Sequence, residues 1–181
     1  MTTVHTVGHG RLTAEAFVSL LDRARIGRVV DVRSFPGSRH NPHFGREQME
    51  RWLTEAGIDY VWLRELGGRR RLAGPSMHVA LRNDSFRAYA DYMQTPSFRA
   101  GVEQLMVLVA RDPTTVMCSE SVWWRCHRRL IADYLVLARG ISVVHLMHDG
   151  RLVAHVPTSG VRVAGDDLVY DVGATPPLTL E

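Results

Sequence analysis

Short apolar segments alternate along this chain with segments of helical periodicity, and this alternation limits the folds open to it. Residues 4–8, 28–33, 59–63 and 114–118 have the pattern of short buried strands. Between the first two, four apolar residues at helical spacing follow the capping residue Thr13: Phe17, Leu20, Leu21 and Ala24. Strands that alternate with helices favour a parallel sheet, so we predict one α/β domain, a mainly parallel sheet flanked by helices.

Four further helices are predicted from the same spacing. One contains Met49 and ends at Gly57, and the next begins with Asp84 as its cap. Pro96 starts a third, because proline suits a first helical turn but not a helix interior. The last, which carries residues 130–138, ends at Gly140.

The C-terminal part of the chain has the pattern of antiparallel hairpins. Residues 141–148 and 151–156 flank Asp149-Gly150, a two-residue turn signal. A further hairpin is expected within residues 161–172, followed by a loose tail. We therefore expect the α/β domain to span residues 1–157 and a C-terminal extension to span residues 158–181.

Composition excludes several classes of protein. Of 181 residues, 45% are hydrophobic and 23% are charged, which is typical of a folded domain rather than a disordered chain. No apolar run reaches the ~18 residues that a membrane span requires. Two cysteines cannot form a disulfide scaffold, so a cytoplasmic location is expected. A net charge of +3 is too small to indicate nucleic-acid binding by itself.

Glycines and chemically active side chains follow four of the predicted strands. The set comprises Gly8, His9, Asp31, Arg33, Pro36, Ser38, Arg39, Gly67, Gly68, Cys118, Glu120, Cys126, His127 and Arg128. In open α/β sheets, ligands bind beyond the carboxyl ends of the parallel strands. We therefore expect these residues to converge on one site, beside a long loop at residues 64–83 of the kind that is often functional.

Asp31 and Arg33 lie two apart on a predicted strand, so their side chains point to the same face. They could pair with each other or hold a shared ligand. With Ser38 and Arg39 nearby, Arg33 would suit a phosphate or a carboxylate.

The two cysteines allow more than one interpretation. Cys118 ends an apolar strand, where a cysteine is more often a packing residue than a nucleophile. Cys126 is expected in the first turn of a helix, where the backbone dipoles would lower the pKa of its thiol. A nucleophilic or redox role, and a disulfide between the two, stay open.

Metal and proton-transfer chemistry depend on the same segments. Cys118, Glu120, Cys126, His127 and His9 are residue types that bind metals, but their spacing matches no metal motif, and no metal site or identified cofactor is predicted. A proton-transfer role is expected for Glu120 with His127 or His9.

Several segments in consistent order resemble the domain-of-unknown-function family 488. They are residues 6–9 (TVGH), 30–36 (VDVRSFP), 38–42 (SRHNP), 66–71 (LGGRRR), 86–96 (FRAYADYMQTP), 117–120 (MCSE) and 124–133 (WRCHRRLIAD). The resemblance implies a cytosolic bacterial or archaeal α/β domain with a site at the predicted rim. It does not indicate which activity the domain has, because the family has no assigned activity. Gly10 stands where many relatives have serine, so a hydroxyl contact there is in doubt.

Together these features predict a protein that binds a small anionic or nucleotide-like ligand at this rim, with an enzymatic role left open. One alternative is a non-catalytic nucleic-acid-binding module that uses Arg69, Arg70 and Arg71 with Trp123 and Trp124. Another is a redox protein based on the cysteine pair. Substrate, reaction and oligomeric state are not predicted.

Overall fold

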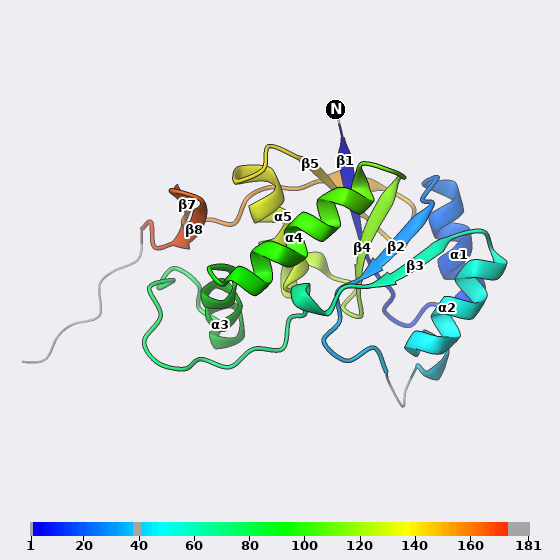
Figure 1. The fold of residues 1–181 in the computed structure, drawn as a ribbon, viewed down its shortest axis with the longest axis horizontal. Helices are drawn as coiled ribbons and strands as arrows, with labels where there is room; N and C mark the ends of the chain where they lie inside the picture. The colour runs from blue at the N-terminus through cyan, green and yellow to red at the C-terminus, as the bar shows by residue number, and fades with distance from the viewer. Residues whose placement is uncertain (1, 38–40, 174–181) are drawn as a thin grey trace, which may run out of the picture.

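The computed structural model describes residues 2–37 and 41–173, which form a mixed α/β domain (Figure 1). Six strands form one sheet in the order β3-β2-β4-β1-β5-β6. Their bounds are β1 Thr3–Gly8, β2 Arg28–Asp31, β3 Asp59–Trp62, β4 Thr114–Cys118, β5 Ser142–Leu146 and β6 Leu152–Ala154. The first five are parallel and β6 pairs antiparallel with β5, which confirms the predicted mainly parallel sheet.

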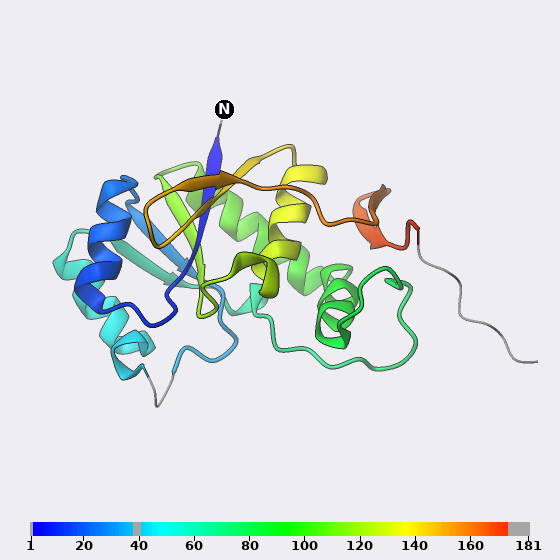
Figure 2. The same cartoon turned by 180° about the vertical axis from the view of Figure 1, so that it is seen from behind.

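Helices cover both faces of the sheet (Figure 2). They are α1 Ala14–Arg23, α2 Arg46–Glu55, α3 Asp84–Met93, α4 Pro96–Val109 and α5 Arg128–Leu137. Helices α1 and α2 pack with Val29 and Met117 on one face, whereas α3, α4 and α5 pack with Val30 and Val116 on the other. Adjacent strand residues thus enter opposite cores, as expected for a sheet covered on both sides.

Most helix ends lie where the sequence predicts them. The Thr13 hydroxyl accepts a hydrogen bond from the Ala16 backbone at 3.2 Å, and α4 begins at Pro96. The cap predicted at Asp84 is wrong by one residue. Asn83 caps α3 instead, and its side-chain oxygen accepts from the Ser85 backbone at 2.8 Å.

The two predicted hairpins are present, with one difference in turn length. Met147 donates its backbone N–H to the Arg151 carbonyl at 2.9 Å, so the turn between β5 and β6 holds three residues, not two. Gly150 ends the turn at φ +86°, in the left-handed conformation that favours glycine.

The second hairpin, β7 Val161–Ala164 with β8 Asp167–Tyr170, forms a separate two-stranded sheet. Its residues Leu168 and Tyr170 are buried in the same core as α3 and α5. The tail expected after it lies outside the described residues. Among the helices that the structure describes, none is long and apolar enough to cross a membrane.

Candidate functional site

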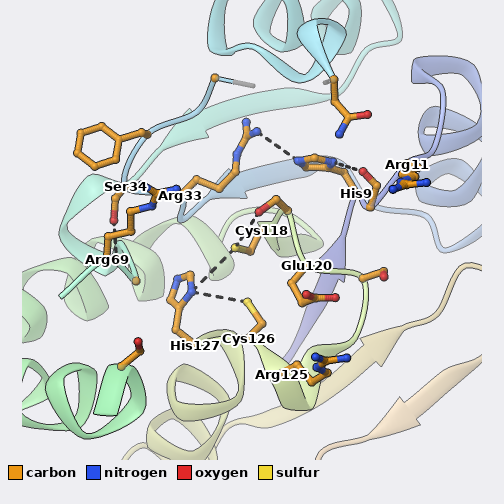
Figure 3. A pocket seen from close by; sticks show the side chains of 18 of the residues that line it. His9, Arg11, Arg33, Ser34, Arg69, Cys118, Glu120, Arg125, Cys126 and His127 are labelled. Carbon is orange, nitrogen blue, oxygen red and sulfur yellow. Dashed lines mark hydrogen bonds between the residues drawn. The ribbon is translucent and has the colours of Figure 1, made fainter. Parts of the chain in front are cut away.

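A cavity of about 660 Å³ opens where β1, β2 and β4 end (Figure 3). Seven of the predicted residues line it: His9, Arg33, Gly68, Cys118, Glu120, Cys126 and His127. The convergence follows from the topology, because β4 lies between β2 and β1 and their carboxyl ends share one edge of the sheet. Gly8, Asp31, Pro36, Gly67 and Arg128 are not lining residues. Ser38 and Arg39 lie outside the described residues.

Asp31 and Arg33 form a buried ion pair. Arg33 Nη2 lies 2.6 Å from Asp31 Oδ2, and Arg33 Nε donates to Asp31 Oδ1 at 2.9 Å. The Tyr60 hydroxyl also donates to Asp31 Oδ2, at 2.7 Å. Of the two possibilities that the sequence left open, the structure therefore contains the pair, and Asp31 is shielded from any ligand.

His9 completes this group on the cavity side. Its Nδ1 donates to the Gly10 carbonyl at 2.9 Å, which leaves Nε2 to accept from Arg33 Nη1 at 3.3 Å. Burial, followed by the Arg33 charge, lowers the pKa of His9 to about 4. The ring stacks on Phe44 with centroids 4.1 Å apart. This neutral, packed imidazole is suited to holding Arg33 in place.

Cys118, Cys126 and His127 meet on the opposite wall. His127 Nδ1 lies 3.6 Å from Cys126 Sγ and 3.9 Å from Cys118 Sγ. His127 Nε2 faces the Val32 carbonyl at 3.1 Å, and a carbonyl can only accept, so Nε2 carries the proton. His127 Nδ1 therefore faces both sulfur atoms.

The thiols are free, buried and unequal. The interaction with Cys126, together with burial, raises the pKa of Cys118 to about 12. The interaction with Cys118 lowers the pKa of Cys126 to about 6, helped by the charge and the backbone N–H of Arg128. Cys126 therefore loses its proton more readily than Cys118.

The expected position of Cys126 in a helical turn is wrong. The residue is extended, at φ −122° and ψ 150°, and α5 begins only at Arg128. A short 3-10 turn at Trp123–Arg125 ends there and changes the chain direction. The first backbone N–H of α5 nevertheless reaches the thiol, so the helix end acts on it from outside the helix.

Arg128 stands behind the cavity rather than in it. The side chain is 1% exposed and donates to the Glu120 carbonyl and, at 3.2 Å, to Thr6 Oγ1. Gly8 makes this approach possible, because a Cβ there would lie 1.8 Å from the Glu120 carbonyl oxygen. Arg128 therefore holds the loop that presents the Glu120 side chain, which is exposed at the cavity.

Arginines from three separate segments surround the cavity mouth. Arg11, Arg69 and Arg125 line it and are exposed, and no described carboxylate forms an ion pair with any of them. Arg69 is fixed at its backbone, where its N–H donates to Ser34 Oγ at 3.0 Å. Arg11 carried no signal in the sequence beyond its position shortly after the first strand.

A scan against protein-family models matches residues 13–135 to the family described as "Domain of unknown function DUF488". The chain belongs to this family. Searches of the curated proteins and of the solved structures found no match. The DUF488 match includes Arg33, Cys118, Glu120, Cys126 and His127, whereas Gly8 and His9 precede it.

Behind the site, this DUF488 chain buries a series of hydrogen bonds that starts at Arg128 and Thr6. Thr6 Oγ1 lies 2.7 Å from His145 Nδ1, His145 Nε2 lies 3.0 Å from His155 Nδ1, and His155 Nε2 lies 2.8 Å from Asp133 Oδ1. Each hydrogen bond in this series can have one donor and one acceptor, from Arg128 Nη1 through the Thr6 hydroxyl and the Nε2 atoms of the two rings to the Asp133 carboxylate. Tyr170 of β8 donates to Asp133 Oδ2 at 3.0 Å.

Proposed function

We propose that the cavity binds a small anionic ligand with a planar ring, such as a nucleoside monophosphate. The observation that carries the proposal is the trio Arg11, Arg69 and Arg125. Three exposed guanidinium groups from separate segments, without carboxylate partners in the described chain, offer several donors to one phosphate or carboxylate. Arg33 is engaged by Asp31 and His9, so it offers few free donors to a ligand, and its charge is largely balanced by that of Asp31.

Phe35 supports the planar part of the ligand. Its ring is 65% exposed at the cavity mouth, and the Arg69 guanidinium lies 5.8 Å from the ring centroid. An exposed aromatic ring beside a cation is suited to stacking a base while the cation contacts its phosphate.

Within this proposal the cavity is an active site. A ligand held at the arginines would lie against the walls that carry Cys118, Glu120, Cys126 and His127, which are the candidate catalytic residues. His9 and Asp31 are candidate positioning residues, because they orient Arg33. Gly67 and Gly68 let the loop after β3 pass close to Ser34 and to the His127 ring.

The nucleic-acid module has less support from the geometry. Trp123 is stacked on His145 with centroids 4.0 Å apart, so one face of its ring is not free for a base. Arg70 lies over the Tyr92 ring at 3.5 Å. Of the features expected to track a nucleic-acid strand, Arg69, Arg71 and Trp124 are exposed.

Calorimetric titration with nucleoside monophosphates, the matching nucleosides and inorganic phosphate tests the proposal. A monophosphate is expected to bind more tightly than either of its parts. Arg69→Gln and Arg125→Gln should each weaken binding by about 1.5–3 kcal/mol, roughly 10- to 150-fold. Arg111→Gln removes an exposed arginine far from the cavity and should leave affinity unchanged.

Equal losses in all three variants would contradict a site at the cavity. Binding only to oligonucleotides, with affinity that falls steeply as salt increases, would favour the nucleic-acid module instead.

A further inference from the structure

Three potential ligand atoms converge at one wall of the cavity. Cys118 Sγ, Cys126 Sγ and His127 Nδ1 all lie within 4.8 Å of one another. Each carries a lone pair suited to a borderline-soft cation, and all three residues line the same cavity (Figure 3).

The two sulfur–nitrogen separations are close to those around a tetrahedral zinc ion. Bonds of about 2.3 Å to sulfur and about 2.0–2.1 Å to nitrogen, at a tetrahedral angle, place sulfur about 3.6 Å from nitrogen. His127 Nδ1 lies 3.6 Å from Cys126 Sγ and 3.9 Å from Cys118 Sγ. The two sulfur atoms lie within 4.8 Å of each other, so modest side-chain movement would bring all three atoms into contact with one ion.

The surroundings of His127 also fit a metal ligand. Metal-binding histidines almost always donate their second ring N–H to a carbonyl or carboxylate, which fixes the ring and frees the other nitrogen. The bond from His127 Nε2 to the Val32 carbonyl, at 3.1 Å, meets this requirement. Gly68 lies close against the ring, where a Cβ would lie 2.3 Å from Nδ1.

We propose that Cys118, Cys126 and His127 together bind one thiophilic divalent cation, with Zn²⁺ as the best fit. Two thiolates and a neutral imidazole would neutralise the ion, so the arginine-lined cavity does not oppose its binding. Three protein ligands leave one tetrahedral position for water or substrate, as in catalytic zinc sites rather than closed structural ones. The sequence did not predict this arrangement, because the spacing of these residues in the chain matches no metal motif.

Metal titration of the full chain tests the site. The protein is kept reduced, stripped with a chelator and shown to contain two free thiols. One equivalent of Zn²⁺ should bind, and Co²⁺ in its place should give the charge-transfer absorption of thiolate ligands. Mg²⁺, which prefers oxygen ligands, should neither bind here nor compete.

Variants assign the ligands. Cys118→Ser, Cys126→Ser and His127→Asn should each weaken Zn²⁺ binding at least about 100-fold, because losing even a partner of a metal ligand costs about 10- to 100-fold. His43→Asn is the matched control: His43 is also half-buried, and its Nε2 faces the Leu12 carbonyl at 2.9 Å. That variant should bind Zn²⁺ as the unmodified chain does.

The Co²⁺ spectrum of the unmodified chain needs no variant, so the test stands even if a cysteine variant fails to fold. Absence of charge-transfer absorption in the reduced protein, or Zn²⁺ binding that survives all three substitutions, would overturn the proposal. The nucleotide titrations above can be run with chelator present, so failure of the metal site and failure of the anion site are distinguishable.

Discussion

The Arg33 guanidinium lies across the Asp31 carboxylate, two residues back along the chain, with Nη2 2.6 Å from Oδ2. Asp31 is fully buried and Arg33 is 6% exposed. The two charges therefore neutralise each other beneath the cavity, and the cationic groups available to a ligand come from the loops around it.

Substitution of Arg33 should mainly lower the free energy of unfolding, and any effect on ligand binding should be secondary. Arg33→Ala leaves the Asp31 carboxylate buried without its counter-charge, which typically costs about 3–5 kcal/mol. Urea unfolding of this variant measures the loss. Replacing both partners, as Asp31→Leu with Arg33→Met, should cost less than the two single substitutions added together. An Arg33→Ala variant as stable as the parent, with weaker ligand binding alone, would contradict the expectation.

Gly8→Ala should destabilise the fold where the end of β1 lies against the loop that follows β4. The new Cβ would lie 1.8 Å from the Glu120 backbone oxygen, so one of the two segments must move. Forced overpacking of this kind usually costs about 1–3 kcal/mol, measurable as a lower melting temperature. Gly37→Ala is the control, since a Cβ there meets no atom within 4 Å. Similar melting temperatures for the two variants would argue against the close approach.

Gly68→Ala should affect the metal site selectively. Its Cβ would lie 2.3 Å from His127 Nδ1, so the ring or the loop at Gly68 would have to shift, and we expect the ring to lose its position against the two sulfur atoms. Affinity for Zn²⁺ is expected to fall about 10- to 100-fold, as when support for a metal ligand is lost. Gly74→Ala changes a glycine of the same loop with nothing within 4 Å and should bind Zn²⁺ normally. Undiminished binding in Gly68→Ala would contradict the expectation that the new Cβ displaces the His127 ring from the metal site.

Stability should decrease in mild acid because of His145. Burial, then His155 and Arg128, lower the pKa of His145 from 6.5 to about 3, so the unfolded chain takes up this proton before the folded one does. The contribution of neutral His145 to the free energy of unfolding is complete above pH 6.5. It is lost as the pH falls toward 3, by about 1.4 kcal/mol per pH unit for one proton.

Urea unfolding of chelator-treated protein between pH 7.5 and 5 measures this slope. Asp133 and Tyr170 also face the series of hydrogen bonds, and His5, His9 and His78 contribute in the same direction because burial lowers each pKa. His145→Gln should therefore reduce the slope of the free energy of unfolding against pH by the equivalent of up to one proton, but should not abolish it. An unchanged slope would show that His145 does not titrate as inferred.

The periodicity of apolar residues in the sequence predicted most of the helices and strands. Strand residues alternate between two buried faces and helix residues repeat every third or fourth position, so the elements could be predicted along the described chain. The exact residue that caps a helix could not be predicted in this way when two neighbouring residues are both suitable. Asn83 and Asp84 are both good caps, and periodicity does not distinguish them.

The convergence of the candidate site residues on one edge of the sheet was predictable, but their contacts were less so. Carboxyl ends of parallel strands meet at one edge whatever their sequence, which brought His9, Arg33, Cys118 and Glu120 together. The direction of Arg128 depends on the irregular turn before α5, and that turn carries no periodic signal. Seven residues separate Cys118 from Cys126, and only the folded turn shows that both sulfurs face His127 Nδ1.

The buried series from Arg128 to Asp133 extends past the part of the chain that defines the family. Asp133 lies inside the matched residues 13–135, but its partners His155, Thr158 and Tyr170 lie beyond them, and Thr6 lies before them. A fragment cut at the match boundaries would carry an internal anion without its donors. The segment by which relatives are recognised is thus smaller than the unit that these buried hydrogen bonds join.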